Sequence, residues 1–187
     1  MPNAADLTTL ANLKLWLNIS PGTTGDDAQL QRLLTAVSVG IQAWLNRSLP
    51  TATYSETKNG NGRAAIMVMN YPVTAVASVT IDGVAIPTRT SVTASGYSFD
   101  SDMIYLDGYT FNRGNQNVAL TYTAGYVTIP LDLEQAAIEL MAMRYKERDR
   151  IGHASLSVGG ETTAFITKDM PDSVKTVLMN YRRVVPV

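Results

Sequence analysis

The sequence contains no cysteine and only one histidine among its 187 residues. Without cysteine the chain has neither disulfides nor thiolate metal sites, which fits assembly in a reducing cytosol. His153 lies in a glycine-containing segment that is expected to be a loop, where an imidazole is a solvated side chain far more often than a catalytic base. A zinc site is not expected, because such sites are built mainly from histidine and cysteine.

The sequence also lacks a basic excess and a long apolar run. Its 15 lysines and arginines face 16 acidic residues, for a net charge of −1. Proteins that bind nucleic acid through its phosphates usually carry a basic surplus or a basic face, so the overall balance does not favour that function. No stretch approaches the ~18 apolar residues of a membrane span, and no basic region precedes an apolar run near Met1, so neither a membrane nor a secretory segment is expected.

Sequence motifs of common enzymes are missing as well. Asn59-Gly60-Asn61-Gly62 lacks the Lys-Ser/Thr pair of a phosphate-binding loop, and a hairpin turn is the interpretation we adopt for it. No serine lies in a GxSxG elbow. Asp100-Ser101-Asp102, close to Asp107, is the best candidate for calcium, but the next alternate position is Ile104, which has no side-chain oxygen. We therefore expect turns there, and a non-enzymatic chain with no cofactor and no metal.

Helical periodicity dominates the first 50 residues. Thr8 to Leu17 predicts a short helix with a threonine cap, and Ser20-Pro21-Gly22 ends it. Asp26-Asp27 predicts the start of a longer helix, because a carboxylate can cap the free N–H groups and also meets the positive end of the helix dipole. The apolar stripe of this second helix consists of Leu30, Leu33, Leu34, Val37, Ile41, Trp44 and Leu45.

From Thr51 to Thr128 the pattern changes to short runs rich in Thr, Val, Tyr and Ile between turn residues, which predicts six or seven strands in a small sandwich or open barrel. Asp82-Gly83 is a strong signal for a two-residue hairpin. We expect strands at Ala64–Met69, Val76–Ile81, Tyr97–Phe99, Met103–Leu106 and Val118–Thr123.

Helical periodicity returns after Pro130, and a last helix is expected from about Met170-Pro171 to Tyr181. The sequence thus predicts an α+β fold, in which a bundle of about four helices is interrupted by an inserted antiparallel β domain. The expected parts are an N-terminal helix pair (1–50), the β domain (51–128), and C-terminal helices (129–187) with a mobile loop at 151–168 and an extended tail at 184–187.

Charged and aromatic residues leave two further alternatives. Charges gather between Arg144 and Arg150, where DNA contact is the sharper interpretation, but the interleaved Glu147 favours ion pairs at a solvated helix end. Trp16 and Trp44 are expected in the core. A sugar-binding β domain would need clustered exposed aromatic residues; strand packing is the simpler interpretation of the candidates Tyr105, Tyr109 and Phe111.

Several segments, in this order, resemble the head–tail connector, or head-completion adaptor, proteins of tailed phages. The most specific is Thr121-Tyr122-Thr123-Ala124-Gly125-Tyr126 followed by Pro130, Asp132-Leu133 and Gln135-Ala136. The others are Leu7–Leu17, Asp26-Asp27 with the helix to Leu45-Asn46-Arg47, Asn70–Val73 with Asp82-Gly83, Tyr145–Arg148, and the Met170-Pro171 helix ending at Tyr181-Arg182-Arg183.

The resemblance implies a structural virion protein without enzymatic activity, which assembles in the host cytoplasm and resides in the neck at the head–tail interface. It implies a ring of about a dozen copies under the portal protein, with head-to-tail contacts between subunits. The ring would extend the channel through which DNA passes without sequence-specific binding, and would offer a platform to a tail-side protein. Another neck or tail component, such as a stopper or tail terminator, or a binding module using the β domain, is the alternative.

Candidate contact residues follow from the same picture. The last residues are expected to extend from the final helix to the portal protein as an added strand or wedge. The broad apolar face of the third helix and the 151–168 loop are expected to contact neighbouring subunits. The residues so predicted are Arg182, Arg183, Val184, Val185 and Val187 for the portal, and Leu140, Arg144, Arg148, Leu156 and Phe165 for subunit contacts.

Overall fold

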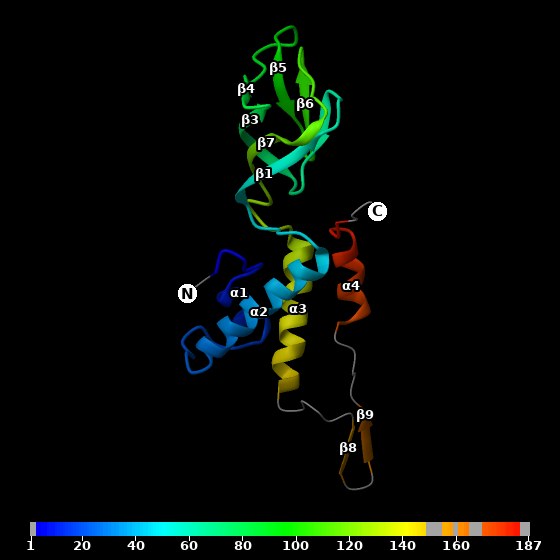
Figure 1. Ribbon diagram of the computed structural model, residues 1–187. Coiled ribbons are helices and arrows are strands. Elements are labelled where there is room, and N and C mark those ends of the chain that lie inside the picture. Colours follow the sequence, from blue (N-terminus) through cyan, green and yellow to red (C-terminus); the bar gives the residue numbers. More distant parts are fainter. Residues whose placement is uncertain (1–2, 149–154, 159–160, 165–169, 184–187) are drawn as a thin grey trace. The chain divides into compact units, whose positions relative to one another are not determined.

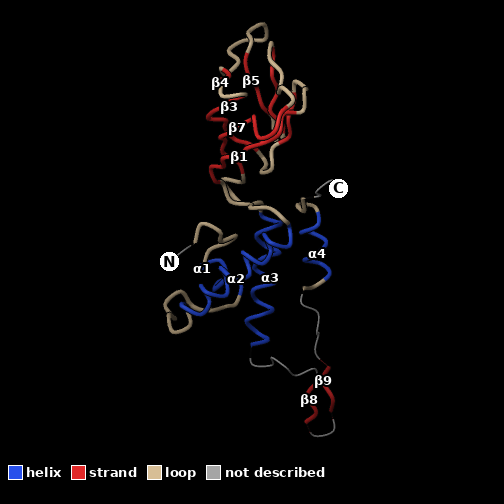
Figure 2. The backbone as a smooth tube through the Cα atoms, viewed as in Figure 1, coloured by secondary structure: helices blue, strands red, loops and turns tan. Residues whose placement is uncertain are grey.

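The structure is a computed structural model, and it describes residues 3–148, 155–158, 161–164 and 170–183 (Figures 1 and 2). The chain forms two compact units, one made of Met1–Leu49 with Thr128–Val187 and the other of Pro50–Val127. We call them the helical unit and the β unit. Along the chain, helices precede and follow a block of antiparallel strands, which confirms the predicted α+β class.

The helical unit is built around α3 (Leu131–Glu147), which packs against α1 (Leu10–Trp16), α2 (Asp27–Leu45) and α4 (Asp172–Met179). Its core comes from apolar residues at helical spacing on all four helices, because each helix buries one face. The buried residues include Leu13, Leu30, Leu34, Val37, Ile41, Leu45, Leu133, Ala137, Leu140, Met141, Val174 and Leu178. In the described part of the chain no helix has the length and apolar character needed to cross a membrane.

The ends of α1 and α2 only partly follow the predicted caps. Thr9 caps α1 by accepting a hydrogen bond from the Asn12 N–H at 3.2 Å, as the threonine pattern suggested. The predicted start of α2 is confirmed, because Asp26 is its N-cap residue, but the expected capping hydrogen bond is wrong, since the Asp26 side chain makes none. Its carboxylate instead accepts a hydrogen bond from the Tyr145 hydroxyl of α3 at 2.9 Å. Asp26 therefore joins two helices rather than satisfying its own helix end.

A buried lysine closes the loop between α1 and α2. The Lys14 side chain is only 6% exposed, and its Nζ lies 2.6 Å from Oδ1 of Asp27. The same ammonium donates to the carbonyl oxygens of Thr23 at 2.6 Å and of Pro21 at 3.3 Å. One cation therefore holds both the loop carbonyls and the first turn of α2.

The connection between α3 and α4, expected to be a loop, contains a short antiparallel hairpin. Its strands are β8 (Ser155–Val158) and β9 (Glu161–Ala164). Four residues per strand, with polar and apolar residues alternating only in Ser155–Val158, are too short a pattern to distinguish from loop sequence.

The β unit contains seven strands in two antiparallel sheets. The first sheet has the order β1 (Ala52–Gly60), β7 (Gly114–Ala124), β3 (Val73–Ile81) and β4 (Val84–Ile86). The second has the order β2 (Ala65–Met67), β6 (Met103–Asp107) and β5 (Gly96–Phe99). Their inward-facing residues form a shared core that includes Ile66, Val79, Ile81, Tyr97, Ile104, Leu106, Phe111, Val118, Leu120 and Tyr122.

Two predicted turns have different outcomes. Asp82-Gly83 joins β3 to β4 as a hairpin, with both residues at positive φ (52° and 80°), as predicted. The hairpin predicted at Asn59–Gly62 is wrong, because β1 pairs with β7 while β2 pairs with β6. The segment instead carries the chain from one sheet to the other. A Cβ on Gly60 would lie 1.7 Å from the Asn112 carbonyl oxygen, so glycine is needed there for a close backbone approach.

Candidate interaction surfaces of the helical unit

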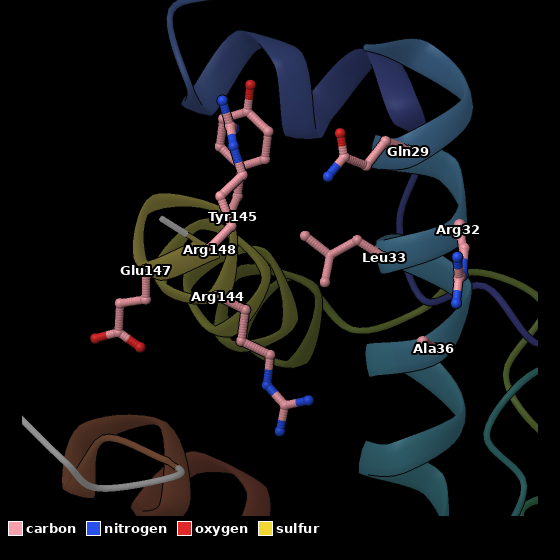
Figure 3. Close-up of a pocket in the computed structure, with 8 residues that line it drawn as sticks. All are labelled: Gln29, Arg32, Leu33, Ala36, Arg144, Tyr145, Glu147 and Arg148. Atoms are coloured by element: carbon pink, nitrogen blue, oxygen red, sulfur yellow. The ribbon is translucent and has the colours of Figure 1, made fainter. Parts of the chain in front are cut away.

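An apolar groove with a charged rim lies between α2 and α3. Gln29, Arg32, Leu33 and Ala36 line it from α2, and Arg144, Tyr145, Glu147 and Arg148 line it from α3, around a volume of about 410 Å³ (Figure 3). Leu33 points from α2 toward α3 across this space (Figure 3). Leu33 belongs to the predicted stripe of α2, and it serves the groove instead of the fully buried core.

One arginine of the groove rim lies against an aromatic ring. The guanidinium of Arg148 lies over the Tyr145 ring, 4.0 Å from its centroid. Figure 3 shows the Glu147 carboxylate pointing away from the α2 side of the groove. Arg150 lies outside the described residues, so the ion pairing expected in this charged segment stays a prediction. The residues that line the groove include three arginines, Arg32, Arg144 and Arg148, and one acidic residue, Glu147.

A second surface lies between α1 and the first half of α3. It exposes Leu15 (78%), Trp16 (50%) and Leu131 (79%), next to the partly polar hollow that Asn12, Asn18, Glu134, Gln135 and Ile138 help to line. The Glu134 carboxylate accepts hydrogen bonds from the Thr8 hydroxyl at 2.6 Å and from the Asn12 amide at 2.8 Å, which hold α1 on α3. We call Leu15, Trp16 and Leu131 the apolar patch.

The exposure of the three residues of the apolar patch was not predicted from the sequence. The prediction of a core position for Trp16 is wrong, because half of its surface is exposed. Leu15 falls outside the spacing of the buried Leu13, and Leu131 lies off the buried face that begins with Leu133. Apolar residues out of phase with the buried stripe were the available signal.

The end of α4 is fixed to the rest of the helical unit. The Tyr181 hydroxyl donates to the carboxylate of Asp132 at 2.8 Å. The Arg182 guanidinium lies 5.1 Å from the Trp44 ring centroid, and the Arg183 N–H donates to the Leu45 carbonyl oxygen at 3.0 Å. The predicted portal-binding residues Arg182 and Arg183 therefore lie beside the C-terminal end of α2.

The other predicted contact residues are distributed differently. Arg144 and Arg148 are exposed and line the groove, whereas Leu140 is 2% exposed and packs inside the helical unit. Leu156 lies on β8, where the structure describes the backbone alone. Phe165, Val184, Val185 and Val187 lie outside the described residues, as does His153. Contacts by these residues stay predictions.

The candidate calcium loop of the β unit is occupied by its own hydrogen bonds. The Asp100 carboxylate accepts from the Tyr105 hydroxyl at 2.8 Å and from the N–H groups of Met103 and Asp102 at 3.0 and 3.1 Å. The bond from Tyr105 is the main cause that lowers the pKa of Asp100. Asp107 pairs with Arg89 at 2.5 Å. No cluster of three or more metal-ligating side chains occurs among the described residues.

The three aromatic residues considered for sugar binding, Tyr105, Tyr109 and Phe111, lie in two different environments. Phe111 is fully buried in the core, as the packing interpretation expected. Tyr105 and Tyr109 are partly exposed, and the hydroxyl of Tyr105 is engaged by Asp100.

Comparison with known proteins supplies the family. The family model described as head completion protein matches residues 6–184. No curated protein sequence matches the chain. Among solved structures, a chain from the neck of an empty GTA particle, computed with C6 symmetry, is 21% identical with a TM-score of 0.61 and covers 97% of this chain and 92% of its own length.

Two further solved structures have the same fold. A chain from the virion of a native gene transfer agent (GTA) particle is 20% identical, with a TM-score of 0.61 and coverage of 100% and 94% of the two chains. A chain from the neck of a native GTA particle, computed with C12 symmetry, is 20% identical, with a TM-score of 0.58 and coverage of 100% and 97%. At these sequence identities, the likeness to the solved structures establishes the fold alone. The family is established by the family model, which matches nearly the whole sequence. The chain therefore belongs to the head completion protein family, and its role is that of a structural head–tail adaptor of a virion.

Proposed function

We propose that copies of this chain form a ring beneath the portal protein, which extends the DNA channel and provides the platform for tail or stopper attachment. The family match over residues 6–184 is the observation that carries the proposal. The similar chains come from particle necks computed with C6 and C12 symmetry, which supports a cyclic arrangement of copies in the neck of the virion. A twelvefold arrangement agrees with the expected ring of about a dozen subunits.

The helical unit provides the two different faces that a closed ring needs. In a head-to-tail ring each subunit meets its two neighbours through different surfaces. The groove between α2 and α3 and the apolar patch between α1 and α3 are two such surfaces. We propose that the ring is formed mainly through this unit.

The portal contact is proposed for the end of the chain. The hydrogen bond from the Arg183 N–H to the Leu45 carbonyl oxygen holds the last described residue beside the C-terminal end of α2, which supports this proposal. The valines of this segment have the β-branched side chains that suit an added strand. A chain truncated after Arg183 should lose portal binding in a pull-down, whereas Met179→Ala, an exposed change on α4, should keep it. Unchanged binding of the truncated chain would remove the tail from the contact.

We further propose that the protein acts without catalysing a reaction. DNA would pass through the ring without sequence-specific contacts, in agreement with the net charge of −1. The chemistry of the described residues agrees with this role, because the hydrogen-bonded carboxylates of the β unit serve its turns.

Deletion of the coding gene tests the function. We expect DNA-filled heads without tails in electron micrographs, and restoration of tailed particles when the purified protein is added to these heads without any cofactor. Normal numbers of tailed, infectious particles after deletion would refute the adaptor role.

A further inference from the structure

We infer that the apolar patch of one copy packs into the α2–α3 groove of the next copy in the ring. The inference rests on the proposed ring and specifies its subunit contact. Its two sides are Leu15, Trp16 and Leu131 on one copy, and the space around Leu33, Ala36 and Tyr145 on the neighbour.

The patch has the character of a buried contact that lacks its partner. Leu15 and Leu131 leave more than three quarters of their surface exposed, and Trp16 adds half of the largest side chain in proteins. Isolated exposed leucines are common, but two leucines and a tryptophan beside one hollow form a contiguous apolar surface. Tryptophan is also the residue most enriched among the energetic anchors of protein interfaces.

The groove matches this patch in chemistry. Leu33 and Ala36 of α2 and the Tyr145 ring of α3 present apolar surface, and Arg32, Arg144 and Arg148 surround it. An arginine beside an incoming indole ring makes a cation–π contact of the kind that Arg148 already makes with Tyr145. The hollow beside the patch is lined by one acid, Glu134, and by no basic residue, so its charge complements that of the groove rim.

The positions of the two surfaces require contact between different copies. Both include residues of α3, but Gln135 in the patch region and Tyr145 in the groove are ten residues apart, which is about 15 Å along a helix. A patch therefore cannot fill the groove of its own copy. Contact of one groove with another would place three arginines against three, which like-charge repulsion opposes. Patch-to-groove contact is the head-to-tail type that closes a ring.

Cross-linking tests the contact directly, because the natural chain has no cysteine. Leu15→Cys and Ala36→Cys each change one exposed side chain, the first in the patch and the second in the groove. The two variants are mixed under conditions in which the full-length protein forms rings with the portal, and are treated with a short bis-maleimide. We expect a cross-linked dimer from the mixture and none from either variant alone.

The other outcomes overturn the inference in recognisable ways. Cross-linking of Leu15→Cys alone would indicate a patch-to-patch contact. Rings of normal mass without cross-linking in the mixture would refute this contact and leave the adaptor function standing. Failure of the natural protein to form rings under any condition would refute the ring and the contact together.

A matched pair of substitutions adds a readout that does not depend on linker reach. Trp16→Ala should raise the protein concentration needed for ring formation at least tenfold, because it removes the central anchor. Met179→Ala removes a side chain of similar exposure (52%) on α4 and should leave that concentration within twofold. Circular dichroism of both variants checks that the fold is retained, and equal effects of the two would contradict the contact.

Discussion

The buried ammonium of Lys14 gives a sharp test of how the helical unit is held together. Lys14→Met keeps most of the side-chain volume but removes the positive charge. The change deprives Asp27 of its partner at 2.6 Å and leaves the carbonyl oxygens of Thr23 and Pro21 without their donor. The α1–α2 loop should lose its main connection to the start of α2.

The expected cost follows from burial. Removing one partner of a buried ion pair costs about 3–5 kcal/mol. The Asp27 side chain keeps 30% of its surface exposed, so water replaces part of the lost interaction, and we expect about 3 kcal/mol. With a urea dependence of about 1.5 kcal/mol per molar, the unfolding midpoint should fall by about 2 M.

Tryptophan fluorescence is the appropriate assay, because both tryptophans, Trp16 and Trp44, lie in the helical unit and report its unfolding separately from the β unit. Lys175→Met, on the exposed side of α4, is the matched control and should change stability by less than about 0.5 kcal/mol. In a double-mutant cycle, Asp27→Asn should cost much less in the Lys14→Met background than in the natural protein. A Lys14→Met cost below about 1 kcal/mol, or additive effects in the cycle, would show that this cation does not stabilise the loop.

Three further predictions concern individual residues. Burial, with a hydrogen bond to Glu56, raises the pKa of Tyr122 to about 12, above the ordinary value of 10. The neutral Tyr122 hydroxyl therefore contributes fully to stability below pH 10, and this contribution is lost as the pH rises toward 12. The natural protein should therefore lose β-unit stability more steeply than Tyr122→Phe over this range, measured by circular dichroism during urea unfolding, and parallel slopes would contradict the assignment. Gly60→Ala should destabilise the β unit by about 3 kcal/mol or more, because its Cβ would overlap the Asn112 carbonyl. Gly22→Ala, with open space around its new Cβ, is the control and should be nearly neutral in thermal unfolding. Gly40→Ala, in the exposed middle of α2 with no atom near its new Cβ, should stabilise the helical unit by about 0.5–1 kcal/mol in the tryptophan assay, and a loss of stability would show that the site is constrained.

The sequence was most informative where one local pattern decides the structure. The stripe from Leu30 to Leu45 predicted α2, and the change to strand residues after Pro50 predicted the β unit. Asp82-Gly83 predicted its hairpin because both residues tolerate positive φ. Each of these signals is contained within a few neighbouring residues.

Features that depend on distant pairing were not predictable in the same way. β1 pairs with β7, more than fifty residues along the chain, so the turn at Gly60 could not be distinguished from a hairpin. Asp26 has the sequence pattern of a helix cap. The sequence does not show that its hydrogen-bond partner, Tyr145, lies on another helix. The exposure of Trp16 likewise depends on which side of α1 meets α3, and the spacing of one short helix does not determine that.

We propose above all that this chain forms a ring on the portal protein. Native mass spectrometry of the purified portal ring, with and without added protein, measures this most directly. We predict that the portal complex gains about a dozen copies of 20.2 kDa in one cooperative step, with few intermediate species. A portal that gains no mass, or that binds scattered single copies without forming a complete ring, would contradict the account.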